Sequence, residues 1–512
     1  MNRPITIRTV VASLLTFGLF MFLIAILLNN DSVTYGLIKK SPNWSWPTYH
    51  GSYNGQHFSQ LKQINKDSVK NLSLKWSRKM TDAEFMVNTP IVHNGIMYLS
   101  VNNNVYAFSA TTGEEIWRWN DFEYERLAKN RGVAFLDDKL FFLTSNCRLI
   151  ALNRKTGELI WLVNYAIGPG YYSNIAPLAM NGKVILGVSG GDNGARGFVV
   201  AFSADNGKEL WRFWTAPIEG QQGFGTWGSA TPAGASTWLT GTYDPELNIL
   251  YWTTGSPWPD FDKSGRPGDN LYSNSVIALN PDNGSLVWHY QFMQGDTHGW
   301  DATEVPVLID DKLRKLLVQA HRNGFLYILD RETGEFISGR PFVKKLTWAS
   351  GLHPGTGKPF IVPGLETPND DPDQNLCPWL RGATNWMSPS YSPKSELFYV
   401  VALEQCRQDG GEFYIKAINI SSGELTWERG LGSGYITPGV LSTAGGLIFV
   451  GDGFKKFNAL DDNTGEVLWS YDTGEDIFAS PITYIAKSVQ YVAIVSGTKI
   501  NVFSLNNMRP RL

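Results

Sequence analysis

ALNRKTGELIW, from Ala151 to Trp161, is the stretch that decides the fold. Two runs with apolar residues flank a short polar turn, and the turn ends in Gly157. Runs of this kind predict β-strands, and a glycine after polar turn residues supplies the positive φ that a tight hairpin needs. Trp161 closes the second strand and offers a large flat face for packing. The stretch therefore predicts a β-hairpin that packs against a neighbouring unit.

The same pattern recurs along the chain. The other full copies are AFSATTGEEIW (Ala107–Trp117), AFSADNGKELW (Ala201–Trp211), ALNPDNGSLVW (Ala278–Trp288), AINISSGELTW (Ala417–Trp427) and ALDDNTGEVLW (Ala459–Trp469), and a weaker copy without the tryptophan is ILDRETGEFIS (Ile328–Ser338). Successive turn glycines, from Gly113 to Gly465, are 44, 50, 77, 50, 89 and 42 residues apart. A period of about 40–50 residues is typical of propeller blades, each with four short strands. The two long intervals predict insertions near residues 214–270 and 339–385.

The two ends of this region complete one more blade. VKNLSLKW (Val69–Trp76) looks like an outer strand without its inner strands, and YVAIVSGTKINVFSL (Tyr491–Leu505) looks like inner strands without an outer one. Joined, they make an eighth blade that removes the free sheet edges. We therefore predict an all-β fold, an eight-bladed β-propeller with tryptophan-docking repeats over residues 44–512.

The N-terminal segment differs from the rest in composition. Arg3 and Arg8 precede an uncharged apolar run, Val10–Leu28, which is 19 residues long. About 20 apolar residues span a bilayer, and the core of a signal peptide is usually shorter, about 7–15 residues. We expect residues 1–30 to form one transmembrane helix that anchors an exported protein, with residues 31–43 as a linker. A cleaved signal peptide is the alternative.

Charge and cysteine content exclude some classes. The net charge is −3, and only 18% of residues are charged. The sequence implies no basic patch, so we do not expect nucleic acid as a partner. The chain has three cysteines, Cys147, Cys377 and Cys406, of which two can pair in an exported protein. No Cys-x-x-Cys-His occurs, so the sequence encodes no covalently attached haem.

Several stretches resemble the quinoprotein alcohol dehydrogenases, eight-bladed enzymes that bind pyrroloquinoline quinone (PQQ) and a metal ion. The stretches are WPTYHGSYNGQHFS (Trp46–Ser59), NRGVAF (Asn130–Phe135), TYDPELNILYWTTG (Thr242–Gly255), RPGDNLYSNSVIALN (Arg266–Asn280), HRNGFLYILDRETG (His321–Gly334), NWMSPSYSPKSELFYV (Asn385–Val400) and LSTAGGLIFVGD (Leu441–Asp452). They cover nearly all of the chain after residue 44. The resemblance implies a periplasmic dehydrogenase that oxidises an alcohol and passes electrons to a cytochrome c or a membrane ubiquinone.

The resemblance also assigns residues to the cofactor. It implies that Trp238 forms the flat floor under PQQ and that Arg322 contacts the quinone oxygen. The remaining implied cofactor contacts are Arg131, Asn174, Ser189 and Asn385. A flat, polyanionic cofactor needs aromatic and polar groups of this kind around it. The family often has a disulfide in the region of Cys377 and Cys406, and this implies that these two residues pair.

The metal site and the catalytic base follow from the same resemblance. Asp192 stands where the family usually has Glu, and Ser256 stands where it has a metal-binding Asn. Both offer oxygen ligands suited to calcium or a lanthanide. Asp301 matches the acidic segment that supplies the base, which takes the alcohol proton. We expect Asp301 and Arg322 to be the catalytic residues and Asp192, Ser256 and Asp301 to hold the metal.

The segment GDTHGWDATE (Gly295–Glu304) departs from the family pattern of Trp-Asp-Tyr followed by Asp or Thr. Without a gap, the base position falls on Gly299 and Asp301 takes the second acidic position. With a gap of one residue, Asp301 is itself the base, and His298 is a further candidate. The adjacent cysteine pair that many members carry before Asn-Arg-Gly is also absent, because that place reads ERLAKNRG.

These departures leave two other hypotheses open. One is a non-enzymatic eight-bladed scaffold of the outer-membrane assembly type, which shares the hairpin repeat. The other is a degenerate quinoprotein relative that has lost the cofactor or binds it weakly.

Overall fold

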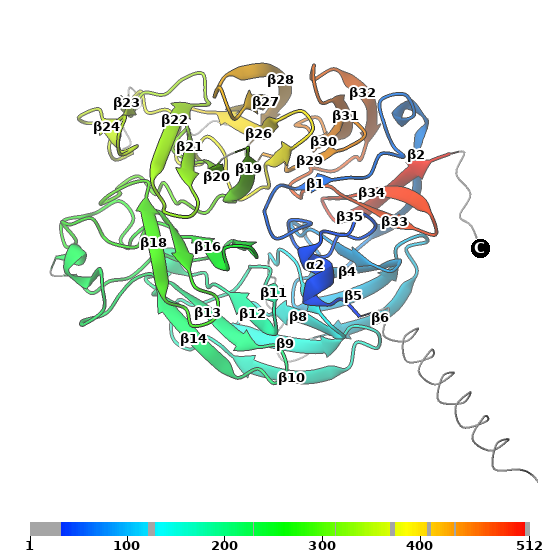
Figure 1. The fold of residues 1–512 in the computed structure, drawn as a ribbon, viewed down its shortest axis with the longest axis horizontal. Coiled ribbons are helices and arrows are strands. Elements are labelled where there is room, and N and C mark those ends of the chain that lie inside the picture. The colour runs from blue at the N-terminus through cyan, green and yellow to red at the C-terminus, as the bar shows by residue number, and fades with distance from the viewer. Residues whose placement is uncertain are drawn as a thin grey trace, which may run out of the picture.

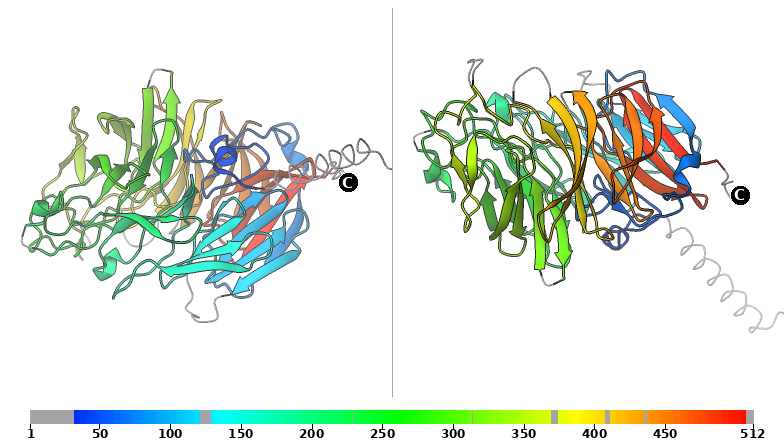
Figure 2. Two further views of the ribbon diagram at one scale, coloured as in Figure 1. Left: turned by 60° about the horizontal axis from the view of Figure 1, so that its bottom comes forward. Right: turned by 90° about the horizontal axis from the view of Figure 1, so that it is seen from above.

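The computed structural model describes residues 32–120, 129–228, 230–312, 314–368, 374–406, 411–434 and 437–506. Within these residues, eight antiparallel sheets form a ring around a common centre (Figure 1). The two side views show the sheets standing side by side around the ring (Figure 2). The prediction of an eight-bladed, all-β propeller is confirmed.

The first four blades follow one another in sequence. Blade one contains β3 (Ile91–His93), β4 (Ile96–Val101), β5 (Asn104–Ser109) and β6 (Glu115–Asn120), and blade two contains β7 (Ala134–Leu136), β8 (Lys139–Leu143), β9 (Arg148–Asn153) and β10 (Leu159–Asn164). Blade three contains β11 (Leu178–Met180), β12 (Lys183–Leu186), β13 (Phe198–Ser203) and β14 (Glu209–Trp214). Blade four contains β15 (Thr242–Asp244), β16 (Ile249–Thr253), β17 (Ser275–Leu279) and β18 (Leu286–Gln291).

Blades five to seven repeat this order. Blade five contains β19 (Val307–Asp311), β20 (Arg314–Ala320), β21 (Phe325–Asp330) and β22 (Phe336–Pro341), and blade six contains β25 (Ser390–Ser392), β26 (Leu397–Glu404), β27 (Gly411–Asn419) and β28 (Leu425–Gly434). Blade seven contains β29 (Val440–Thr443), β30 (Leu447–Gly451), β31 (Lys456–Asp461) and β32 (Val467–Asp472), and the short β1 (Phe58–Ser59) pairs in parallel with β29.

Blade eight is built from both ends of the propeller. Its inner strands are β33 (Ile482–Ala486), β34 (Val489–Ser496) and β35 (Lys499–Leu505), and its outer strand is β2 (Leu72–Lys79). β2 is antiparallel to β35, with Trp76 opposite Val502. The predicted closure is confirmed, and it leaves no break between the first and last sheets of the ring.

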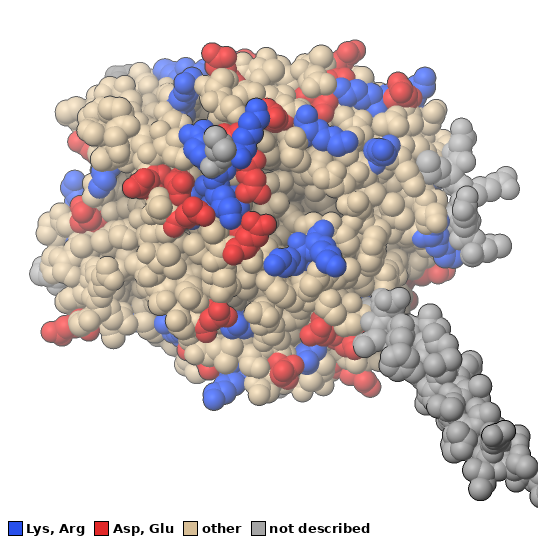
Figure 3. Space-filling model, viewed as in Figure 1, with Lys and Arg blue, Asp and Glu red and all other residues tan. Residues whose placement is uncertain are grey.

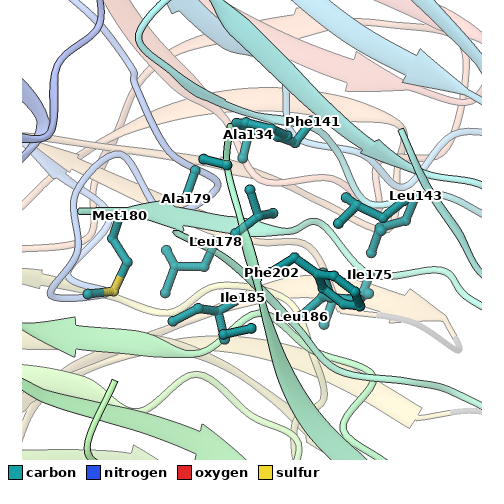
Figure 4. Packing of buried hydrophobic residues seen from close by; sticks show 14 of the residues in the cluster. Ala134, Phe141, Leu143, Ile175, Leu178, Ala179, Met180, Ile185, Leu186 and Phe202 are labelled. Carbon is teal, nitrogen blue, oxygen red and sulfur yellow. The ribbon is translucent and has the colours of Figure 1, made fainter. Parts of the chain in front are cut away.

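Burial explains the two kinds of strand. All residues of the inner β8 except Lys139 are buried, whereas the outer β10 exposes four of its six side chains. Neighbouring blades pack apolar side chains into a shared core, with Phe141 and Leu143 of blade two near Leu178 and Ile185 of blade three (Figure 4). Inner strands are therefore covered on both faces and read as nearly continuous apolar runs.

The repeated tryptophan joins one blade to the next. In six junctions its ring lies so close to the turn glycine of the following blade that an added Cβ would come within 2.5–2.8 Å of it. The pairs are Trp76–Gly113, Trp117–Gly157, Trp161–Gly207, Trp211–Gly284, Trp288–Gly334 and Trp427–Gly465. Each of these glycines has a φ between +71° and +78°. Glycine is thus required twice, for the turn and for the contact.

The insertions differ from the prediction in one detail. The interval 214–270 is not one insertion, because β15 and β16 of blade four lie inside it, after the 3-10 helix η3 (Phe224–Trp227). The second insertion carries a two-stranded sheet of β23 (Ala349–Leu352) and β24 (Pro359–Ile361).

A disulfide joins Cys377 to Cys406, as the resemblance implied, and Cys147 is a buried free thiol.

The N-terminal residues 32–43, expected as a linker, contain the helix α2 (Tyr35–Lys39). Val33 exchanges backbone hydrogen bonds with Asp137 of blade two, and Ile38 is fully buried. Among the described residues no helix is long and apolar enough to cross a membrane. The transmembrane helix predicted for residues 1–30, including Val10–Leu28, lies outside the described residues.

The docking contact makes a prediction about stability. Trp288→Ala should lower the free energy of unfolding by about 3–5 kcal/mol, because it leaves a cavity over Gly334 and removes the hydrogen bond from Trp288 Nε1 to the Arg331 carbonyl. Denaturant unfolding followed by tryptophan fluorescence measures the loss. Val287→Ala is the matched control, because Val287 is 49% exposed and should change stability by less than about 1 kcal/mol. Equal losses in the two variants would contradict the docking role.

Candidate active site

The predicted site residues lie at one end of the blades. Five of them lie in the loop that precedes the innermost strand of a blade: Arg131 before β7, Asn174 before β11, Trp238 before β15, Asp301 before β19 and Asn385 before β25. Four follow a second strand: Ser189 and Asp192 after β12, Ser256 after β16 and Arg322 after β20. In an antiparallel blade the start of the first strand and the end of the second lie at the same edge. The propeller therefore brings residues from five blades to one face.

An ion pair forms the centre of the site. Arg322 Nη1 lies 3.1 Å from Asp301 Oδ2, and both side chains are largely buried, at 17% and 16% exposed. The backbone N–H of Ser256 donates to Asp301 Oδ1 at 2.6 Å, and the N–H of Asp301 donates to the Ser256 hydroxyl at 3.2 Å. Arg322 is also fixed through Nη2, which donates to the Leu380 carbonyl at 2.6 Å. Asp301, Ser256 and Arg322 are thus in direct contact.

Asp192 belongs to the same electrostatic group. It lies in the 3-10 helix η2 (Gly191–Asn193), whose flanking residues Gly190 and Gly194 both have left-handed backbone angles. Burial raises the pKa of the Asp192 carboxyl, and the negative charge of Asp301 raises it further. Arg322 acts in the opposite direction. Removal of the Asp301 charge should therefore lower the pKa of Asp192.

Small residues let these segments approach each other. A Cβ added at Gly255 would come within 2.7 Å of Asp301 Oδ1, and one added at Gly191 would come within 2.7 Å of Ser236 Oγ. Ser236 also lies 3.1 Å from the Cβ position of Gly255. Ser236 thus packs between the loop that carries Asp192 and the loop that carries Ser256, and no motif in the sequence pointed to it.

The second part of the site is aromatic and cationic. The Arg131 guanidinium lies 4.8 Å from the centre of the Trp238 ring and 4.7 Å from that of Trp386. Arg131 Nη1 donates to the Asn174 carbonyl at 3.1 Å, and the Ser189 hydroxyl donates to Asn174 Oδ1 at 2.8 Å. Four of the predicted cofactor residues are therefore one contact group.

Arg131 is a buried cation with unused binding capacity. Only 6% of it is exposed, and its Nε is buried with no hydrogen-bond partner among the described residues. Burial lowers the pKa of the Arg131 guanidinium to about 10. A buried guanidinium beside two indole rings suits a flat ligand that carries carboxylates. The residues present thus fit PQQ.

Asn385 and Arg322 line a common cavity of about 210 Å³. The Asn385 side chain donates to the Arg381 carbonyl at 3.3 Å, and Trp386, Met387 and Thr437 complete one wall. The cavity connects the ion-pair group with the aromatic group, because Trp386 also contacts Arg131. It offers space next to Arg322, which is paired with Asp301.

Asp296 organises the divergent segment, and the sequence analysis missed it. Its carboxylate is fully buried and accepts hydrogen bonds from the backbone N–H groups of His298, Gly299 and Trp300 at 2.9–3.1 Å. The Ser256 hydroxyl donates to the same carboxylate at 3.1 Å. Burial raises the pKa of Asp296, and the hydrogen bonds lower it. The available signal was an Asp two to four residues before the amide groups that it accepts from, a common turn pattern.

His298 and Gly299 do not supply a base in this arrangement. His298 is fully buried, its ring stacks on Trp300 at 3.4 Å between centres, and burial holds its pKa well below the usual range. Gly299 has φ +80°, and a Cβ there would meet only the Phe261 ring, at 3.7 Å. Asp301 is therefore the acidic side chain that this segment presents to Arg322.

Two further carboxyls near the site were also missed. Burial raises the pKa of Asp260 to about 7, with contributions from the charges of Asp301, Asp192 and Asp296. Burial raises the pKa of Glu304 well above its usual range, and Gln319 contacts that carboxyl at 3.5 Å. Asp260 lies in an insertion without a repeat pattern, so no spacing in the sequence pointed to it.

The three residues predicted to bind a metal include only two carboxylates, Asp192 and Asp301. In the described part of the chain no three His, Cys, Asp or Glu side chains gather as a ready metal site. Asp192, Ser256 and Asp301 nevertheless supply hard oxygen donors, and the mutual repulsion of Asp192 and Asp301 favours a cation between them. The chemistry of these donors fits calcium or a larger trivalent ion.

Comparisons with known proteins agree with this reading. Residues 46–339 match the family model described as glucose/ethanol/alcohol dehydrogenase, β-propeller domain, for PQQ proteins. Residues 411–496 match the model of the outer-membrane protein assembly factor BamB. The quinohemoprotein alcohol dehydrogenase ADH IIB of Pseudomonas putida is 36% identical to this chain over 508 residues, which cover 88% of this chain and 73% of that protein.

Two solved structures are similar over most of their length. The quinohemoprotein alcohol dehydrogenase of Comamonas testosteroni aligns with a TM-score of 0.86 at 28% identity, covering 94% of this chain and 84% of that one. A europium-containing methanol dehydrogenase aligns with a TM-score of 0.84 at 26% identity, covering 91% and 99%. Fold and site define a quinoprotein-type propeller with a buried cation–aromatic pocket. The chain belongs to the family of PQQ-dependent glucose, ethanol and alcohol dehydrogenases.

The raised pKa of Asp260 predicts that this carboxyl destabilises the folded protein at high pH. Its carboxyl keeps its proton up to about pH 7 when folded but loses it near pH 4 when unfolded, so the folded protein loses stability as the pH rises between these values. In metal-free buffer, Asp260→Asn should therefore stabilise the protein at pH 8 by about 1–2 kcal/mol, after allowance for solvent screening, and by little at pH 4.

Denaturant unfolding at the two pH values, with a chelator present, measures this difference. Asp262→Asn is the control, because Asp262 is solvent-exposed and its pKa is lowered by its hydrogen bonds with Ser264. That variant should gain no stability at either pH. A gain in Asp260→Asn that is the same at pH 4 and pH 8 would rule out the raised pKa.

Proposed function

We propose that this protein is a PQQ- and metal-dependent dehydrogenase that oxidises an alcohol. The observation that carries the proposal is the contact between Asp301 and Arg322 beside the cavity that Asn385 lines. Asp301, which can take a proton, and Arg322, which can bind a carbonyl oxygen, thus lie beside the same cavity. Family membership supports the same conclusion.

PQQ would be held by the aromatic and cationic group. Trp238 gives its ring face, and Arg131 gives a guanidinium whose buried Nε has no partner among the described residues. Ser189 and Asn174 would contribute polar contacts beside Arg131, and Asn385 would do so from the opposite wall. When bound, PQQ accepts the hydride of the alcohol, and a neighbouring cation makes the quinone carbonyl more electrophilic.

Asp192, Ser256 and Asp301 would hold the metal. Calcium and lanthanides both prefer oxygen donors, and Asp192 has a shorter reach than the Glu that the family usually places there. One structural relative is a europium-containing methanol dehydrogenase, which supports a test of both kinds of ion.

Within the chain, Asp301 accepts the hydroxyl proton of the alcohol at its carboxylate. Arg322 keeps that carboxylate in position through the 3.1 Å contact and can donate a hydrogen bond to the oxygen that gains charge. Asp296 fixes the segment from His298 to Trp300 and thereby the approach of Asp301. The buried side chains around the pair limit access of water.

Electrons would leave to a cytochrome c or a membrane ubiquinone, and the protein would work in the periplasm. The apolar run Val10–Leu28 supports export and is long enough for an anchor in the inner membrane. On the face in Figure 3, basic and acidic side chains are mixed among uncharged residues, which gives no support to nucleic acid as a partner.

The alternatives are a non-enzymatic scaffold and a degenerate relative. The match of residues 411–496 to an outer-membrane assembly factor covers only repeats that any such propeller shares. A scaffold needs neither the buried Arg131 between two indoles nor the Asp301–Arg322 pair. Reconstitution of the exported domain with PQQ plus calcium, or plus a lanthanide, separates the hypotheses, because failure to bind PQQ with either ion would refute the enzyme.

The two roles assigned to Asp301 can be separated by substitution. In the reconstituted protein, Asp301→Asn keeps an oxygen ligand but cannot accept a proton, so dye-linked alcohol oxidation should fall by about 10²–10⁴-fold while PQQ absorbance is retained. Asp301→Ala should lower both PQQ and metal retention. Asp205→Ala, at a carboxylate 86% exposed, is the control and should match the wild type. Full turnover by Asp301→Asn would assign the base to another group.

A further inference from the structure

One junction between blades lacks its tryptophan. In the repeat Ile328–Ser338, Ser338 stands at the position of the docking indole, and it pairs with Ile328 across β21 and β22. In the other repeats a tryptophan pairs with alanine at this register, for example Trp288 with Ala278. Ile328 stands where the other repeats have alanine, and the Arg340 side chain contacts the turn glycine Gly423 in place of an indole.

A cavity of about 240 Å³ remains at this junction. Its walls include Leu316, Leu326, Ile328 and Ile420, each no more than 6% exposed, and Ser338 lies at its side. Polar residues complete the wall: Arg314, Ser338, Arg340, Ser421 and Ser422. A cavity of ~150 Å³ is enough to hold benzene in an engineered protein. The space beside Ser338 is thus large enough for a flat aromatic ring.

The receiving side of the junction is intact. Gly423 of the next blade keeps the turn of the other repeats, with φ +71°. At five other junctions the docking Nε1 donates to the carbonyl three residues before the turn glycine, as Trp288 does to Arg331 and Trp427 to Asp462. The equivalent carbonyl here belongs to Ile420, which lines the cavity. The cavity therefore presents an acceptor where an indole N–H is bound elsewhere.

A cation lies at the mouth of the cavity. The Arg340 side chain covers Gly423, with its Nε 3.0 Å from the position of an added Cβ. Arg340 is exposed and has no carboxylate partner among the described residues, whereas the nearby Arg314 is paired with Asp311 at 3.3 Å. A flexible guanidinium without a partner can turn to meet a carboxylate from a ligand.

We propose that this cavity binds a small, flat aromatic carboxylate of the indole class. The ring lies where the docking tryptophan is absent, its N–H donates to the Ile420 carbonyl, and its carboxylate pairs with Arg340. The site lies between β20, β21 and β22 of blade five and the turn between β27 and β28 of blade six. It is apart from the face that carries Asp301 and Trp238, so it is independent of the proposed function.

The test is binding of indole-3-acetate to the whole protein by isothermal titration calorimetry. One saturable site per chain is expected. Ser338→Trp, which restores the docking indole, should weaken binding at least tenfold while the melting temperature and the dye-linked activity are unchanged or higher. Ser338→Leu fills less of the cavity and should also weaken binding of indole-3-acetate. It serves as the test variant if Ser338→Trp folds poorly.

Two further variants assign the contacts. Arg340→Gln should weaken indole-3-acetate about tenfold and leave neutral indole unaffected. Trp238→Ala should leave binding intact, because Trp238 lies at the other site. No saturable binding to the wild type, or equal binding by Ser338→Trp and the wild type, would overturn the proposal. Loss of binding in Trp238→Ala alone would also overturn it.

Discussion

The contact of a tryptophan ring with the turn glycine of the next blade is the interaction on which this structure depends. Six such contacts fix the distance and angle between neighbouring sheets. Pairing of β2 with β35 then closes the ring. In every blade the first strand begins, and the second strand ends, at the same edge of the sheet. Residues far apart in the sequence therefore meet on one face of the ring. Asp192 and Asn385 share a site for this reason and not through any local motif.

The site adds to this frame two buried groups of opposite character. Arg131 lies among indole rings with part of its guanidinium unpaired, and Asp301 is held between Arg322 and the Ser256 amide. Keeping such groups buried costs free energy that packing elsewhere in the ring must offset. A fold that bound no charged ligand would gain stability by losing them, and this is the physical reason to assign them to PQQ and a metal ion.

The fold and part of the candidate site could be predicted from the sequence, each from a different kind of signal. The blades follow from a repeat with fixed period, and Trp238 and Arg322 follow from resemblance to a known family. Asp296 and Asp260 could not be found in this way, because their importance comes from burial and from neighbours brought in by other loops. The repeat did not predict that β15 and β16 lie inside the first insertion, because these strands carry neither the turn glycine nor the docking tryptophan. Both alignments of the segment place Asp301 at the site, and the structure brings its carboxylate into contact with Arg322.

The most direct test of the central claim is anomalous diffraction from crystals of the protein reconstituted with PQQ and a lanthanide. We predict one strong anomalous peak within about 2.3–2.6 Å of carboxylate oxygens of Asp301 and Asp192, with a flat ligand over Trp238. A peak elsewhere, or an Asp301 that stays paired only with Arg322 while no ion is bound, would contradict it.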